Sequence, residues 1–312
     1  MKYIDKYILH REALAINRSF LKDCYAHDIK HPIPSPDDTK GAYEDFKKPI
    51  YRDGQNGWKQ LLLQEQTCYG YPRCCYCMRK LNTERGLINY EHVIPRTLTD
   101  ASQHVECQYY FDHAPALHDH VKMGDVFCAT SFDTVDDIDR EEQMPHTTAL
   151  SNLLVACNGK HDSFHTTGCC CNGARGDDKL LPLMLMPEAD SAARYDANGL
   201  LSVACDDGTW NKTIDELNET TLSEIRAVWC RLSKVPKEVD TADSMKMSER
   251  IAWFKTAYHT NNFEALPQSV KRYIGVIDGS DDTYWRLLLA YDWFYYYPGY
   301  ARQRYTSSCT DS

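Results

Sequence analysis

The spacing of apolar side chains along the chain predicts several helices. Within residues 13–25, the apolar residues Leu14, Ile16, Phe20 and Leu21 recur with helical periodicity, which indicates a helix with one buried face. A turn-rich stretch of prolines and aspartates separates this helix from the next apolar segment. Further helices are predicted over residues 58–66, 219–232, 248–258 and 268–276.

Strands are predicted at two places where the apolar runs are short. Residues 87–90 end immediately before Glu91 and His92, so a strand there delivers both side chains to its end, and Pro95 opposes a simple continuation. Residues 195–201 predict a hairpin with Asn-Gly at its turn. This mixture of helices and short strands indicates an α+β protein.

The pattern divides the chain into three predicted regions. Residues 1–66 form a helical N-terminal segment, residues 67–187 contain all the candidate chemistry, and residues 188–312 form a hairpin followed by helices. Residues 100–148 look like an insertion, rich in acids and histidines and poor in periodicity, which predicts a long loop, either mobile or used for regulation or docking. The aromatic residues within 285–300 predict either a docking face or a buried terminal helix.

Length and composition indicate the size of the core and the cellular compartment of the protein. The 312 residues suffice for one large domain or two small ones with a buried core. No apolar run is long enough to span a bilayer and the first residues do not resemble a signal peptide, so a reducing cytoplasm is the expected location. In that compartment the 14 cysteines are expected to be buried thiols and metal ligands and not disulfides.

The charge balance argues against strong unaided binding to nucleic acid. The chain carries 35 basic and 45 acidic residues, a net charge of −10, whereas DNA binding depends on the neutralisation of phosphates. A nuclease with this balance needs a local basic groove or a partner that delivers the nucleic acid.

Cysteine spacing predicts a structural zinc site. Cys74 and Cys77 form a Cys-x-x-Cys pair, which places two sulfurs on one tight turn. Cys157 and one of the cysteines at 169–171 supply the second pair that tetrahedral zinc requires. The alternative is a set of buried thiols without metal. Neighbouring residues that could substitute as ligands are Cys68, Cys75, Cys169, Cys170, His161 and His165.

A second constellation fits the hydrolysis of a phosphodiester, which needs an activated water, charge stabilisation on the phosphate and help for the leaving oxygen. His92 suits the general base, because histidine ordinarily titrates near neutral pH. A divalent cation, Mg²⁺ or Mn²⁺, suits the other two roles, and Glu91 and Asn172 offer oxygen ligands for it. Arg96 and Arg175 are candidate phosphate contacts. A lone Glu-His pair, by contrast, is more often two surface side chains.

The order of these residues resembles that of the HNH nuclease superfamily. Residues 90–96, Tyr-Glu-His-Val-Ile-Pro-Arg, lie between the two cysteine pairs. The resemblance implies a zinc-braced ββα-metal core in which Asn152 ties the loop that carries the histidine and Glu91 and Asn172 hold the catalytic metal. It also selects Cys171 as the fourth zinc ligand, because Cys-Asn-x-x-Arg-Gly matches the family pattern, with Arg in place of Lys.

Shorter matches resemble more specifically the HNH subunit of Septu-type anti-phage systems, a family also found beside some retrons. They fall in residues 1–6 and 60–232 and include Glu-Gln at 65–66 and Thr-Ile-Asp-Glu-Leu-Asn at 213–218. The resemblance implies a nuclease that works with an ABC/SMC-like ATPase and is held in check by it. The expected activity is therefore Mg²⁺- or Mn²⁺-dependent hydrolysis of DNA in defence against phage.

Two other functions stay open on the sequence. A zinc-braced adaptor that binds the ATPase without catalysis needs none of Glu91, His92 and Asn172, so the presence of all three disfavours it. A nuclease directed at RNA or tRNA uses the same chemistry, and nothing in the sequence separates DNA from RNA.

Overall fold

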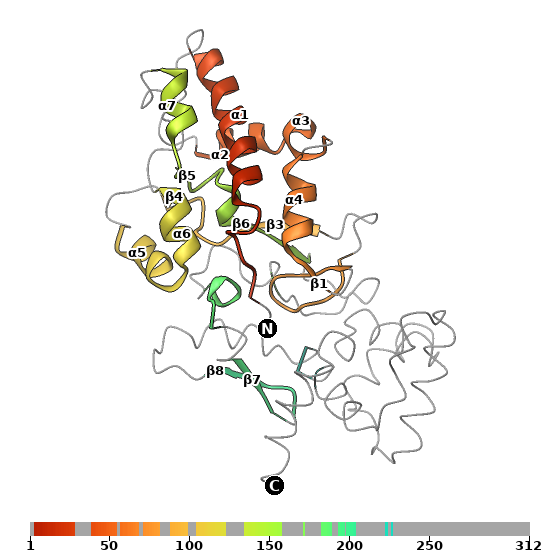
Figure 1. The fold of residues 1–312 in the computed structure, drawn as a ribbon. Coiled ribbons are helices and arrows are strands. Elements are labelled where there is room, and N and C mark those ends of the chain that lie inside the picture. Colours follow the sequence, from red (N-terminus) through yellow and green to blue (C-terminus); the bar gives the residue numbers. More distant parts are fainter. Residues whose placement is uncertain are drawn as a thin grey trace. The chain divides into compact units, whose positions relative to one another are not determined.

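A computed structural model describes part of the chain, and its helices and short sheets are compatible with the predicted α+β class (Figure 1). The chain divides into two compact units, each described here by itself. The first comprises Met1–Cys75, Ile88–Ala156 and Arg175–Asp190, and the second comprises Tyr76–Leu87, Cys157–Ala174 and Ser191–Ser312. The described residues are 3–28, 39–54, 57–68, 71–81, 88–98, 104–122, 134–157, 171, 182–188, 193–196, 198–203, 222, 223 and 226.

Two of the predicted helices are confirmed. The helix predicted over residues 13–25 lies within α1, His10–Asp28, and the one predicted over 58–66 coincides with α4, Trp58–Glu65. The helices predicted beyond residue 218 lie outside the described residues, apart from single positions at 222, 223 and 226. Other helical segments are α2 Thr39–Phe46, α3 Pro49–Arg52, α5 His104–His113, α6 Pro115–His120, α7 Val135–Arg140 and the 3₁₀ turns η4 Leu150–Asn152 and η5 Leu183–Leu185.

Strands in the described part of the chain pair two by two. The strand predicted at 87–90 is β3, Ile88–His92, so Glu91 and His92 stand at its end as expected. Its neighbour is β6, Leu153–Cys157, which lies far along the sequence. The other pairs are β1 Thr67–Cys68 with β2 Tyr71–Pro72, β4 Val121–Lys122 with β5 Met144–Pro145, and β7 Ala193–Tyr195 with β8 Leu201–Val203.

The predicted hairpin in the second unit is confirmed. β7 and β8 pair antiparallel, with Tyr195 opposite Leu201. Gly199 at the turn has a φ of 77°, in the left-handed region that glycine adopts at little cost. The Asp196 carboxylate accepts a hydrogen bond from the backbone N–H of Asn198 at 2.9 Å. The turn residues therefore determine how the two strands meet.

The region of residues 100–148 is not the long irregular loop that we expected. Its described parts contain α5, α6 and α7 as well as β4 and β5. α7 begins with a capping box, in which Thr134 and Asp137 each accept a hydrogen bond from the other's backbone N–H. It lies beside α1 (Figure 1). Helices of 6 to 10 residues contain too few apolar repeats for a period to show, which explains the error.

The N-terminal helices pack around a layer of aromatic rings. Phe20 of α1 lies 4.8 Å from Phe46 of α2, and Phe46 lies 5.7 Å from Trp58 of α4, measured between ring centroids. The indole N–H of Trp58 donates to the carbonyl of Phe46 at 2.9 Å, so its one polar atom is satisfied inside the core. Among the described helices, none is both long and apolar enough to cross a membrane.

A buried ion pair ties the N-terminus to the start of β6. The ammonium of Lys6 lies 2.5 Å from the carboxylate of Glu65, and both side chains are almost completely buried. Lys6 also donates to the carbonyls of Leu150 and Leu153, at 3.1 and 2.8 Å. Burial raises the pKa of Glu65 and the adjacent Lys6 opposes the rise. The pair thus has the added hydrogen bonds that a buried charge needs.

A second buried side chain, Gln66, ties β6 to the segment that leads into the first cysteine pair. Its amide group donates to the carbonyls of Arg73 and Val155, at 2.8 and 2.7 Å, and accepts from the N–H of Val155 at 2.6 Å. The N–H of Cys75 also donates to the carbonyl of Val155. Gln66 therefore sets the position of the chain immediately before Cys74.

Candidate functional site

β3 delivers Glu91 and His92 into a buried environment. Glu91 is 4% exposed and His92 is 9% exposed, so neither is the ordinary surface side chain that a lone Glu-His pair suggests. The strand ends there because Pro95 cannot donate to a continuing ladder. The two side chains that the sequence selected for chemistry are therefore held by the core.

The imidazole of His92 is anchored through one nitrogen. Its Nε2 lies 2.9 Å from the carbonyl oxygen of Thr147. A carbonyl can only accept, so Nε2 carries the proton in this contact. The neutral ring then has its lone pair on Nδ1, the nitrogen that can accept a proton. The Tyr43 ring meets the imidazole edge to face, with 4.5 Å between the centroids.

A single side chain, Asn152, holds both stretches of backbone around His92. Its carbonyl oxygen accepts from the N–H of Ile94 at 2.7 Å, and its amide nitrogen donates to the carbonyls of Ile94 and His146, at 3.0 and 2.6 Å. Asn152 is 0% exposed. It thus fixes the chain two residues after His92 and the residue before Thr147, which holds the His92 ring.

Arg96 lies on the same loop, half-buried. Its guanidinium carbon is 4.7 Å from the centroid of the Tyr43 ring, and one terminal nitrogen is 4.0 Å from the carboxylate of Glu44. That nitrogen is buried and makes no hydrogen bond to the described residues. Asn172 and Arg175, the other predicted contacts to metal and phosphate, lie outside the described part of the chain.

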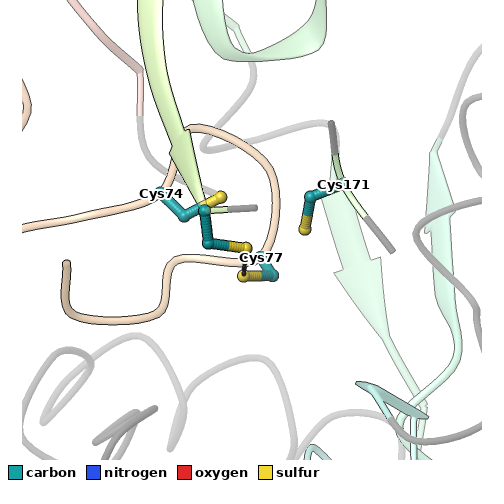
Figure 2. Close-up of side chains that lie close together, drawn as sticks. Cys74, Cys77 and Cys171 are labelled. Atoms are coloured by element: carbon teal, nitrogen blue, oxygen red, sulfur yellow. Dashed lines mark hydrogen bonds between the residues drawn. The ribbon is translucent and has the colours of Figure 1, made fainter. Parts of the chain in front are cut away.

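The four cysteines chosen as zinc ligands lie close together. The Sγ atoms of Cys74, Cys77, Cys157 and Cys171 are all within 4.8 Å of one another and all four residues are buried, so they could hold a metal ion such as zinc. Figure 2 shows the three labelled side chains: Cys74 and Cys77 come from one loop, and Cys171 approaches them from another segment.

The spacing of the sulfurs fits tetrahedral zinc. Zn–S bonds of about 2.3 Å place tetrahedral sulfurs about 3.8 Å apart. The Sγ atoms of Cys77 and Cys157 are 3.9 Å apart. Cys171 and Met78 both have positive φ, at 56° and 63°, a conformation that residues other than glycine rarely adopt. Two unusual backbone positions in these segments are consistent with sulfurs held by a bound ion.

Most of the other candidate zinc ligands lie outside the described residues. Cys75 is buried beside the cluster but is not one of the four. The side chain of Cys68 and the residues at 161, 165, 169 and 170 are outside what the structure describes. Of the three adjacent cysteines, Cys171 alone belongs to the described residues, and it is a member of the cluster.

His146 adds a buried imidazole beside this network. It is 0% exposed, and neither ring nitrogen makes a hydrogen bond within the described residues. Burial lowers the pKa of His146 to about 4, and the nearby backbone of Arg96 offsets part of the shift. The ring is therefore neutral at physiological pH.

Sequence reasoning missed two contacts of His92. Thr147 acts through its backbone carbonyl, which any residue provides, so no side-chain pattern reveals it. Tyr43 belongs to the N-terminal helices and is distant in sequence, and an aromatic residue on a short helix predicts only burial.

Comparison with protein-family models, with curated proteins and with solved structures finds no match for this chain. The resemblance to HNH nucleases therefore rests on the residues themselves and on their order in the sequence.

Proposed function

We propose that the protein is a metal-dependent endonuclease of the HNH type that hydrolyses phosphodiester bonds of DNA. The observation that carries the proposal is the set of hydrogen bonds from Asn152 to the loop that follows His92. The resemblance to the HNH superfamily assigns that role to an asparagine at this point in the order. The pairing of β3 with β6 supports it further, because two paired strands are the ββ part of such a core.

In this proposal His92 is the general base. Nδ1 of the neutral ring accepts a proton from the attacking water, and Nε2 remains bonded to the carbonyl of Thr147. That carbonyl fixes the tautomer and stabilises the imidazolium that forms, as an acceptor on the second nitrogen does in other histidine-dependent enzymes. Asn152 fixes the position of the Thr147 carbonyl relative to His92, because it bonds the backbone near both.

The remaining roles belong to oxygen ligands and to cations of the chain. Glu91 and Asn172 would hold Mg²⁺ or Mn²⁺, which supplies Lewis-acid stabilisation of the phosphate and of the leaving oxygen when bound. Arg96 and Arg175 would bind phosphate oxygens. The cysteine cluster would hold zinc in a structural role, because four thiolates leave no open position for a substrate.

We also propose that an ABC/SMC-like ATPase delivers DNA to this site, as in Septu-type anti-phage systems. The net charge of −10 supports a need for such a partner. Among the described residues around α2 and α3, the basic side chains are offset by neighbouring acids. The ion pairs there are Lys47–Glu44, Lys48–Asp45, Arg52–Asp53 and Lys59–Asp53.

The test is cleavage of plasmid DNA and of single-stranded RNA in the presence of Mn²⁺. Wild-type protein is compared with His92→Ala, each alone and with the ATPase. His118→Ala is the matched control, because His118 is an exposed histidine on α6. We expect metal-dependent cleavage of DNA that His92→Ala reduces by about 100-fold or more and that His118→Ala leaves unchanged.

Other outcomes separate the alternatives. Cleavage of RNA alone would replace DNA by RNA as the substrate. Absence of cleavage under every condition, with zinc bound and the ATPase still associated, would favour the non-catalytic adaptor. Activity that survives in His92→Ala would remove His92 from the mechanism.

A further inference from the structure

Tyr43 on α2 contacts the two side chains of the proposed site that lie on the β3 loop. Its ring meets the His92 imidazole at an interplanar angle of 77°, with 4.5 Å between the centroids. The guanidinium of Arg96 lies over the same ring, 4.7 Å from the centroid, within the range of a cation–π interaction. One aromatic ring from the N-terminal segment thus contacts both the proposed base and a proposed phosphate contact.

The neighbouring aromatic residue of α2 has a different environment. Phe46 follows Tyr43 by three positions, so both lie on one side of the helix. Phe46 is 0% exposed and packs on the rings of Phe20 and Trp58 in the core. Tyr43 is 5% exposed and packs on His92 and Arg96. α2 therefore presents one ring to the core and one to the proposed site.

The hydroxyl of Tyr43 has no part in proton transfer. Burial raises the pKa of Tyr43 well above its ordinary value, and the positive charge of Arg96 offsets only part of the rise. The hydroxyl therefore stays protonated near neutral pH. The contacts of Tyr43 with His92 and Arg96 are made by its ring.

The Tyr43 ring adds a constraint on the orientation of the His92 imidazole. The bond from Nε2 to the carbonyl of Thr147 fixes the position of one nitrogen. The edge-to-face contact favours one orientation of the imidazole plane, because aromatic pairs prefer this arrangement. The face of the same ring fixes the guanidinium of Arg96.

We infer that Tyr43 is a positioning residue that orients the His92 imidazole for proton transfer and the Arg96 guanidinium for phosphate binding. This inference rests on the proposed nuclease function. It assigns the N-terminal helices a part in catalysis, since α2 lies far outside the residues that resemble the HNH order.

The experiment compares three variants of the full chain under conditions in which the wild type cleaves DNA. Tyr43→Phe keeps the ring, Tyr43→Leu removes it, and Phe46→Leu makes the same change on the same helix away from the site. We expect Tyr43→Leu to lower kcat and raise KM, with kcat/KM reduced by roughly 10- to 100-fold. Tyr43→Phe should restore both parameters, and Phe46→Leu should lower the melting temperature with little effect on either.

A spectroscopic measurement keeps this test separate from the test of nuclease function. The ¹⁵N chemical shifts of labelled histidine, assigned to His92 with His92→Ala, report the tautomer and its titration. We expect the Nε2–H tautomer in all three, because the bond to Thr147 remains, and His92 ring signals that are shifted or broadened in Tyr43→Leu alone, because the Tyr43 ring no longer restrains the imidazole plane. Equal His92 signals in all three, or equal kinetics of Tyr43→Leu and Phe46→Leu, would overturn the positioning role. Loss of the nuclease function alone would leave the spectroscopic difference in place.

Discussion

The two ends of β6 are held in different ways. At its start, Lys6 and Gln66 reach the strand from distant segments and bond the peptide groups of Leu153 and Val155. Asn152, the residue immediately before the strand, bonds the backbone of Ile94 and His146. At its end, Cys157 meets three other cysteines. At the first end, hydrogen-bond donors and acceptors of the chain satisfy one another. At the second end, four thiols lie together.

This difference predicts which end depends on something outside the chain. Buried amides and carbonyls that pair with one another need no further partner. Four thiols within 4.8 Å repel one another once they ionise, unless a cation lies among them. The start of β6 should therefore be stable without metal, and its end should not.

The largest effect is expected at the cysteine end. Cys77→Ser should abolish zinc binding and lower the free energy of unfolding by more than about 4 kcal/mol, because the metal contributes folding energy directly. Metal content by mass spectrometry and urea unfolding measure both effects. Cys107→Ser is the control, since Cys107 is a buried thiol of α5 outside the cluster and should keep the zinc. If the wild-type protein contains no zinc and is no more stable than Cys77→Ser, the cluster is a set of buried thiols without metal.

A smaller effect is expected at the hydrogen-bonded end. Asn152→Ala leaves the N–H and carbonyl of Ile94 and the carbonyl of His146 without their partner, and should cost about 3 kcal/mol or more. Asn17→Ala breaks two bonds, to Thr148 and Leu150, and should cost about 2 kcal/mol. Urea unfolding measures both.

The pair of asparagines also separates stability from activity. Asn152→Ala should lose the proposed nuclease activity because the His92 loop is released, and Asn17→Ala should keep it. Zinc content should stay at the wild-type level in both. Equal activity in the two variants would mean that Asn152 has a structural role only.

The smallest effect comes from pH. Burial lowers the pKa of both His146 and His120 to about 4. At His120 the stacked His10 lowers the pKa further, and the carboxylates of Asp119 and Glu142 offset part of the shift. Between about pH 6.5 and 4 the unfolded chain therefore binds more protons than the folded chain. The free energy of unfolding should therefore decrease as the pH is lowered from about 6.5 to 4, by at most about 1.4 kcal/mol per pH unit for each group.

His146→Leu sharpens this measurement. It replaces one of the two buried histidines by an apolar side chain of similar volume that does not titrate, so the slope of stability against pH should become shallower. A zinc indicator in the same samples shows whether metal release contributes, because protons compete with zinc for thiolates. An unchanged slope in His146→Leu would contradict the lowered pKa.

The sequence predicted best what depends on short spacing. The Cys-x-x-Cys pair, the strand that ends at His92 and the Asn-Gly hairpin each follow from a few adjacent residues. The choice of Cys171 and the role of Asn152 needed the order of motifs in a known superfamily, because an isolated cysteine or asparagine has many uses.

What the sequence could not predict is contact between distant segments. Gln66 bonds Val155 across 89 positions, and Tyr43 reaches His92 from a different helix, without any periodicity that links them. The short helices between residues 104 and 140 were missed because their length hides their period. Burial decides these features, and burial is a property of the whole fold.

The bond from Lys6 to Leu150 has a consequence for the timing of synthesis. The two residues are 144 positions apart, and at 5–20 residues per second a ribosome needs roughly 7 to 30 s to make the second after the first. Until then the ammonium of Lys6 can pair with Glu65 but lacks the two carbonyls, of Leu150 and Leu153, that also accept from it. The His92 site cannot assemble on an unfinished chain, so it forms only after the segment containing β6 has left the ribosome.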